Sequence, residues 1–204
     1  MYEKKTDGQV ERVEVTTTGE TKKIAGVETL VLAEKVWVNG ELVEDTRDYV
    51  AQNKDGNVWY FGEDSVEVAD GKIVNHDGSW EAGINGAKPG VVMKANPIIG
   101  ETYKQEYYKG KAEDMGKVLS LDETVRVPYR NFAGCLKTLD WTKLESNSEE
   151  HKYYCKDVGF VALEVALEDD EQVKLVSFEK NANPRPDTLD RTSSIETKIT
   201  ESRA

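Results

Sequence analysis

Asx-Gly dipeptides placed between β-prone runs constrain this chain more than any other feature of its sequence. Asn39-Gly40, Asp55-Gly56 and Asp70-Gly71 each separate two such runs. Both central residues of a type I′ turn need positive φ, which Asn, Asp and Gly tolerate best, so each dipeptide predicts a tight hairpin. Because the turn chemistry agrees with the flanking pattern, the sequence predicts a meander of antiparallel strands.

The predicted strands extend over most of the chain. They cover Val27–Val38, Glu41–Gln52, 57–61, 66–69, 72–80, 91–93, 102–108, 112–121, 124–127, 136–143, 152–155, 158–167 and 172–178. A short helix over 111–119 is the one alternative to a strand, and the Gly-rich stretch 78–90 predicts a long loop. We therefore expect a mainly β protein, an antiparallel meander that forms a strongly curved sheet, an open barrel or a sandwich.

Length and charge limit the organisation and the partners. A chain of 204 residues suits one domain, which we assign to residues 1–178, with 179–204 as a polar tail. The net charge of −12 disfavours nucleic acid and anionic lipid as partners. No run approaches the roughly 20 apolar residues that span a bilayer, so we expect no transmembrane segment.

Cys135 and Cys155 are the two cysteines of the chain. A hairpin centred on Glu145 would set Thr138 opposite Lys152 and Cys135 opposite Cys155. Directly opposed residues have Cβ atoms about 4.5–5.5 Å apart, which is close to disulfide range. We predict this disulfide, which would place the protein outside the cytosol. Two buried thiols, or a metal or redox pair, are the alternatives.

Motifs for catalysis and cofactor binding are missing from the sequence. It contains no Gly-x-Ser-x-Gly, Walker or dinucleotide-binding pattern and no His-Glu-x-x-His, so we expect no cofactor and no metal. An EF-hand template laid over Asn53 and Asp55 puts Ala51 and Gly62 at essential ligand positions and fails. His76 is predicted in a turn, and His151 in a cross-strand hydrogen bond.

Paired carboxylates leave a hydrolase open as an alternative. A glycosidase needs two carboxyl groups about 5–9.5 Å apart across a cleft, a distance that sequence does not give. The adjacent acidic pairs are Glu63-Asp64, Glu113-Asp114, Asp122-Glu123 and Glu149-Glu150.

Aromatic residues provide the remaining indication of function. Neighbouring aromatics on a strand point to opposite faces, so one fills the core while the other can line a second surface. A curved sheet lined by such rings would form an apolar pocket or a sugar-stacking platform. The candidate ligand-binding residues are Trp59, Trp80, Tyr108, Trp141 and His151.

Three segments resemble parts of uncharacterised secreted or lipid-anchored bacterial β-rich proteins. They are Trp59-Tyr60-Phe61-Gly62-Glu63-Asp64, Gly78-Ser79-Trp80-Glu81-Ala82-Gly83, and Glu150-His151-Lys152-Tyr153-Tyr154 continuing into Val158-Gly159-Phe160-Val161. The resemblance implies export to the periplasm or the extracellular space, with a lipid anchor upstream as a further option. In architecture the chain also resembles the curved sheets of periplasmic lipoprotein carriers.

These observations lead to one expected function and two rivals. We expect an exported β domain that binds a small apolar or amphiphilic ligand, or an envelope protein, on a concave aromatic face without catalysis. The loop 83–90 would act as a lid. The rivals are a hydrolase of glycans or lipids that uses a carboxylate pair, and an interaction module that uses its sheet edges.

Overall fold

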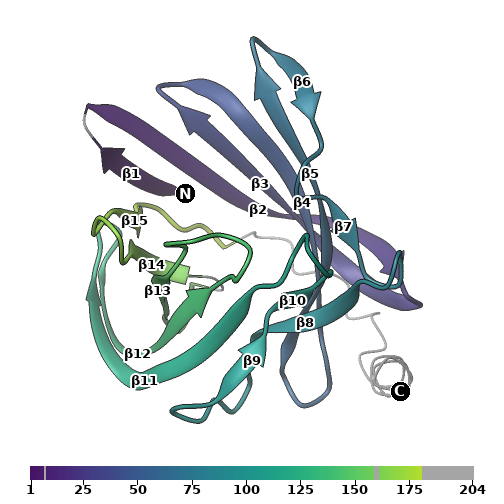
Figure 1. The fold of residues 1–204 in the computed structure, drawn as a ribbon. Helices are drawn as coiled ribbons and strands as arrows, with labels where there is room; N and C mark the ends of the chain where they lie inside the picture. The colour runs from purple at the N-terminus through teal and green to yellow at the C-terminus, as the bar shows by residue number, and fades with distance from the viewer. Residues whose placement is uncertain (7, 159–160, 181–204) are drawn as a thin grey trace.

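The protein folds into one 15-stranded, antiparallel, barrel-like curved sheet (Figure 1). The computed structural model describes residues 1–6, 8–158 and 161–180, and within these ranges every regular element is a strand. The strands are β1 (Tyr2–Thr6), β2 (Gln9–Ile24), β3 (Val27–Val38), β4 (Glu41–Gln52), β5 (Val58–Ala69), β6 (Lys72–Asn75), β7 (Trp80–Glu81), β8 (Lys88–Met93), β9 (Thr102–Lys104), β10 (Glu106–Tyr107), β11 (Met115–Arg126), β12 (Asn131–Trp141), β13 (Glu150–Tyr154), β14 (Val161–Ala166) and β15 (Gln172–Leu175).

Two lobes make up the sheet. The N-terminal lobe contains the long hairpins β2–β5 with β6, β7, β8 and β10. The C-terminal lobe contains β11–β15 with β9, and its strands β11 and β12 are strongly bent (Figure 1). Strand β1 joins the lobes because it pairs with β2 on one side and with β15 on the other. The order along the sheet is β10-β8-β5-β4-β3-β2-β1-β15-β14-β13-β12-β11-β9.

The ends of this path meet at a seam. β9 and β10 lie at opposite ends of the strand order, yet Gln105 alone separates them in the chain. Gly90 on β8 lies against the seam so closely that a Cβ there would be 2.3 Å from the carbonyl of Gln105. Only glycine permits this approach of two backbones. The sheet is therefore nearly closed, which selects the barrel-like form among the predicted architectures.

Each lobe has its own hydrophobic core. The N-terminal cluster is built around residues such as Ile24, Val31 and Phe61, and the C-terminal cluster around Phe132, Val125 and Leu175. The Cys135–Cys155 disulfide, with its Cα atoms 4.5 Å apart, lies in the second cluster. This confirms the predicted disulfide, and the predicted opposition of Thr138 and Lys152 is also observed.

The hairpin turns agree with the sequence at two of three positions. Asn39-Gly40 and Asp70-Gly71 both have positive φ at each residue, as a type I′ turn requires. At Asp55-Gly56 only Gly56 has positive φ, at 92°. The prediction of a two-residue turn is wrong there, because Asn53 caps a longer loop by accepting the Asn57 amide proton at 2.9 Å.

Several predicted boundaries also differ from the observed ones. β1 and β2 were not predicted, and β5 runs without interruption where two strands were expected. A bulge at Gly62, with φ of 130°, lets β5 continue past the point where its pattern changes. β8 begins inside the predicted loop 78–90, and β11 occupies most of the range where a helix was the alternative.

Nowhere in the described ranges is there a helix with the length and apolar character that crossing a bilayer requires. Most of the predicted tail, residues 181–204, lies outside the described residues.

Candidate functional site: the polar inner face

Strand register defines a polar face that continues across both lobes. Directly paired residues on adjacent strands point to the same side of a sheet. One row across the N-terminal lobe consists of Leu32, Asp48, Glu63 and Trp80. One row across the C-terminal lobe consists of Val118, Thr138, Lys152, Glu164 and Val173.

These rows face one another across the concave side of the sheet. Four strand steps separate β3 from β14, which is roughly 19 Å along the sheet at about 4.8 Å per step. Charges that far apart in solvent are screened, since the Debye length is about 8 Å. Burial and the charge of Asp48 raise the pKa of Glu34 on β3 to about 8. Smaller opposing effects come from Glu164 on β14, which raises this pKa, and Lys152 on β13, which lowers it, so both charges lie within reach of Glu34. We call this shared surface the inner face.

A tyrosine hydroxyl connects two carboxyl groups in the N-terminal lobe. Tyr60 donates its hydroxyl proton to Asp48 Oδ1 at 2.7 Å, and the same hydroxyl oxygen lies 3.1 Å from Glu63 Oε2. A hydroxyl carries one proton, so a second hydrogen bond here requires a protonated Glu63 that donates to Tyr60. Burial, together with the nearby Asp48 charge, raises the pKa of Glu63 to about 7. The three groups therefore form a chain that shares protons.

The seam places a further acid beside this chain. Glu106 is 9% exposed, and its Oε2 accepts a hydrogen bond from the indole Nε1 of Trp80 at 3.0 Å. Burial, with the charges of Asp114 and Glu63, raises the pKa of Glu106 to about 8. The Trp80 ring packs edge-on against Tyr60, with centroids 5.6 Å apart. An aromatic pair is thus surrounded by acids that hold their protons near neutral pH.

An ammonium group balances the carboxylates of the C-terminal lobe. Lys152 Nζ lies 3.0 Å from Glu150 Oε1 and 3.9 Å from Asp140 Oδ2. Burial alone would lower the pKa of Lys152, but the charges of Glu164 and Glu150 outweigh it and hold that pKa well above its ordinary value. Gln105 of the seam donates from Nε2 to Asp140 Oδ2 at 2.8 Å. Gln105 and Glu106 therefore reach opposite lobes.

Two buried polar atoms next to Lys152 lack hydrogen-bond partners. Thr138 is fully buried and Asp140 is 3% exposed, and neither Thr138 Oγ1 nor Asp140 Oδ1 has a partner. Buried polar atoms in native proteins nearly always have one. Thr138 lies opposite Lys152 and Asp140 lies opposite Glu150, so both atoms belong to the inner-face strands.

The predicted ligand-binding residues do not form one concave aromatic face. Trp59, Trp80 and Tyr108 pack on the N-terminal cluster. Trp59 lies opposite Ala51, on the other side of β5 from Tyr60, and its Nε1 lacks a partner. Of the three, the contacts place Trp80 among the acids described above. The loop 83–90 is tied down, because Gly83 N donates to Ala87 O at 2.9 Å.

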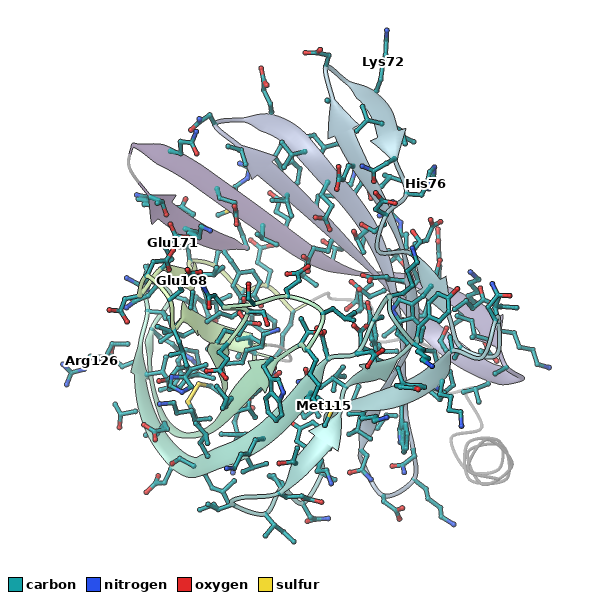
Figure 2. All side chains as sticks on the ribbon, in the orientation of Figure 1. Lys72, His76, Met115, Arg126, Glu168 and Glu171 are labelled. Atoms are coloured by element: carbon teal, nitrogen blue, oxygen red, sulfur yellow. A yellow bond between two sulfur atoms is a disulfide. The ribbon has the colours of Figure 1, made fainter. Side chains whose placement is uncertain are left out.

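Trp141 and His151 lie elsewhere. Trp141 follows Asp140 on β12 and lines a separate pocket. His151 pairs with Leu139 and Val165, on the opposite side of β13 from Lys152. Burial, with the charge of Lys137, lowers its pKa. His76 is exposed beside β6, far from Glu168 (Figure 2).

Sequence reasoning missed the acids of the inner face. Glu34, Asp48 and Glu106 lie within predicted strands, but their alternation with apolar residues looks like an ordinary solvent-facing pattern. Lys152 was placed in register without a role. The sequence analysis considered pairs of adjacent acids as the candidate carboxylates, and Glu63 belongs to one of these pairs. The sequence signal that points to this site is a tyrosine followed three residues later by an acid, with a glycine between them at which the strand bulges.

Among the residues that the structure describes, no group of three or more His, Cys, Asp or Glu side chains is arranged so that it could hold a metal ion. No protein-family model matches the chain, and comparison with curated proteins and with solved structures gives no significant match. The resemblance to exported bacterial proteins therefore stays a prediction, and the inner face has to be interpreted from its own chemistry.

Proposed function

We propose that the domain binds a small amphiphilic molecule with a positively charged group on its inner face, without transforming it. The observation that carries the proposal is the ring pair Tyr60–Trp80 beside two acids: Glu63 Oε2 lies 3.1 Å from the Tyr60 hydroxyl, and Glu106 Oε2 lies 3.0 Å from the Trp80 indole nitrogen. Burial raises the pKa of both acids. Perturbed acids concentrate at functional sites. An ammonium or guanidinium group would pair with their carboxylates and contact the aromatic rings.

Proton release is the expected mark of this binding. A cation near Glu63 and Glu106 favours their charged forms, so it lowers the pKa values that burial raises. Binding near pH 7 then expels protons to solvent. The unpartnered Thr138 Oγ1 and Asp140 Oδ1 support the same proposal, since a ligand donor, or a water that it orders, would satisfy them.

Calorimetric titration tests the proposal with three probes that share one apolar chain. Dodecyltrimethylammonium, dodecyl maltoside and dodecyl sulfate are added below their micelle concentrations in two buffers of different ionisation enthalpy. We expect the cationic probe to bind with proton release, more tightly than the neutral probe, and the anionic probe not to bind. Equal binding of the anionic probe would contradict the proposal.

Matched variants locate the site. Glu63→Gln and Glu106→Gln remove the titrating groups while keeping their shapes, and they should weaken the cationic probe and reduce the proton release. Glu41→Gln, at the exposed start of β4, serves as the control and should change neither. If all three variants bind as the parent does, the inner face is not the site.

A glycan hydrolase is the second candidate because the carboxyl groups of Asp48 and Glu63 lie close together. Asp48 Oδ1 and Glu63 Oε2 lie 2.7 and 3.1 Å from the same hydroxyl oxygen, so they are no more than 5.8 Å apart. Retaining glycosidases hold their carboxyl groups about 5–5.5 Å apart. However, the Tyr60 hydroxyl fills the space where a glycosidic bond would lie. We expect no turnover of aryl glycosides, and turnover that Glu63→Gln abolishes would favour the hydrolase.

We also propose that the protein works in an oxidising compartment, the periplasm or the extracellular space. The Cys135–Cys155 disulfide supports this, because such bonds persist outside the reducing cytosol. Denaturing mass spectrometry of protein taken directly from its native cells, with thiols blocked at lysis, gives the test. A mass two hydrogens short without alkylation is expected, and two alkylated cysteines would contradict the proposal.

A further inference from the structure

A pocket separate from the inner face opens at the β12–β13 hairpin. It has a volume of about 460 Å³, within the range of about 300–1,000 Å³ that is typical of small-molecule sites. Its lining combines one indole with several oxygen acceptors and shares no residue with the acids around Tyr60. We call it the hairpin pocket, and the residues that determine its chemistry are Trp141, Glu145, Asn147, Glu149, Leu167 and Glu168.

The walls of the hairpin pocket are held in place by hydrogen bonds. Thr142 N donates to Ser148 Oγ at 3.1 Å, and the same hydroxyl lies 3.2 Å from the carbonyl oxygen of Thr142, to which it donates. Asn147, with φ of 63°, donates from its amide to Glu168 Oε1 at 2.8 Å. This bond ties the hairpin loop to the turn between β14 and β15, where Glu168 lies beside Glu171 (Figure 2). The pocket is therefore largely formed before any ligand arrives.

The lining chemistry selects one class of ligand. Glu145, Glu149 and Glu168 contribute carboxylates, and among the described residues that line the pocket none is Lys or Arg. Such a surface accepts hydrogen bonds and repels phosphates, sulfates and carboxylates. Trp141 and Leu167 provide a limited apolar area, too small for a lipid chain. Hydroxyl groups are the donors that match this lining, and the apolar side of a pyranose ring can cover an indole.

We propose that the hairpin pocket binds a neutral or amino sugar, with Trp141 as the stacking platform and the glutamates accepting its hydroxyl or ammonium protons. The pocket lies on the other side of β12 from the inner face, since Trp141 follows the inward-facing Asp140. Its occupancy does not depend on the ligand proposed for the inner face.

Fluorine NMR of protein labelled with 5-fluorotryptophan tests the proposal directly. The chain has four tryptophans, and single Trp→Phe variants assign their resonances. The probes are cellotriose, the glucosamine trimer and the galacturonic acid trimer, which are neutral, cationic and anionic. We expect the Trp141 resonance to shift with the first two and not with the third, while the Trp37 resonance stays unchanged.

Two variants decide whether the shift reports the hairpin pocket. Trp141→Ala should weaken binding of cellotriose at least about tenfold. Glu168→Gln keeps an acceptor for Asn147 and should remove part of the advantage of the glucosamine trimer over cellotriose. Trp37→Phe, on β3, is the control and should bind as the parent does. Because Trp141→Ala could also disturb the hairpin, circular dichroism and Trp141→Phe, which keeps a smaller ring, accompany it.

Three results would overturn the proposal. The first is the absence of any Trp141 shift with cellotriose and the glucosamine trimer at saturating concentrations of probe. The second is equal binding of the galacturonic acid trimer. The third is unchanged binding in a folded Trp141→Ala variant.

Discussion

In the N-terminal lobe Asp48 and Glu63 meet at one tyrosine hydroxyl, whereas in the C-terminal lobe Asp140, Glu150 and Glu164 surround the ammonium of Lys152. Both lobes bury carboxyl groups on the same inner face. One lobe neutralises them with protons, and the other neutralises them with a fixed positive charge. A carboxyl proton can dissociate when a cationic ligand binds, but a lysine side chain cannot leave. The N-terminal lobe is therefore the side that can exchange a bound proton for a ligand cation.

The strongest test of this comparison is to remove the ammonium. Lys152→Met leaves Asp140, Glu150 and Glu164 without their cation. Because the Lys152 side chain is 27% exposed, we place the cost at the lower end of the range for a buried ion pair, about 3 kcal/mol. We expect that loss in the free energy of unfolding, measured in urea at pH 7. The loss should shrink at pH 4, where the carboxyl groups take up protons instead.

Lys137→Met is the matched control for this variant. Lys137 lies on the neighbouring strand β12 and stacks over Tyr153 on the other side of the sheet, 5.3 Å from the ring centroid. Its removal should cost less than about 1 kcal/mol. Equal losses from the two variants would show that Lys152 does not balance the inner face.

Removing the disulfide should have the next largest effect and should act on the C-terminal lobe. Cys135 and Cys155 are 20 residues apart in sequence, and a bond that closes a loop of this size contributes about 2–4 kcal/mol. We expect that loss for the double variant Cys135→Ala/Cys155→Ala in urea unfolding. Addition of dithiothreitol should destabilise the parent by a similar amount and leave the double variant unchanged.

Deleting the hydroxyl of Tyr60 tests the proton-sharing chain. The hydrogen bond that Tyr60 donates lowers the pKa of Asp48, against the larger effect of burial. Tyr60→Phe should therefore raise the pKa of Asp48 further and cost about 1–3 kcal/mol, since Asp48 loses its donor. Carbon-13 NMR of the carboxyl groups measures the shift.

Tyr153→Phe provides the control for the loss of a hydroxyl, because Tyr153 lies on the side of β13 opposite Lys152. It should change the stability by less than about 0.5 kcal/mol. An unchanged or lower pKa of Asp48 in Tyr60→Phe would contradict the proposed chain.

The smallest effect concerns the pH dependence of stability. The pKa of Glu63 is about 7 in the folded protein and about 4.5 when unfolded. Because the folded state holds this proton more tightly, its contribution is full below pH 4.5 and is lost as the pH rises to about 7. Glu63→Gln cannot lose a proton, so it should gain about 1.5 kcal/mol relative to the parent between pH 5.5 and 7.

Thermal unfolding of the parent and Glu63→Gln over this pH range provides the measurement. Glu171→Gln is the control, since Glu171 is a surface residue whose pKa is lowered by its hydrogen bond to Lys4. This variant should leave the loss of stability between pH 5.5 and 7 unchanged. Parallel profiles for the parent and Glu63→Gln would show that Glu63 is ionised throughout.

Local sequence signals predicted much of the fold but little of the inner face. Strands β3 and β4, the turns at Asn39-Gly40 and Asp70-Gly71, and the disulfide all depend on neighbouring residues or one hairpin register. β2 was missed because its polar stretch after Val15, rich in Thr, Lys and Glu, does not alternate with apolar residues. A long strand of this kind is stabilised by its two neighbours, which a local pattern does not reveal.

Contacts between lobes could not be predicted for a different reason. Glu34 meets the charges of Glu164 and Lys152 only because the sheet curls, and no hairpin register links these strands. The bond between Trp80 and Glu106 likewise depends on where the sheet closes. Trp80 stays a predicted ligand-binding residue, and its partner Glu106 is set by the whole sheet.

The seam at Gln105 also determines where the folded protein opens locally. β9 has three residues and β10 has two, whereas β2 on the far side of the sheet has sixteen. Local opening requires the least free energy where the fewest backbone hydrogen bonds have to break. The amide protons of the seam should therefore exchange with solvent before those of β2 and β3. The rate of that opening would set how fast a molecule enters or leaves the inner face, so the kinetics of binding would be governed by two short strands, in which Glu106 alone also contributes to its strength.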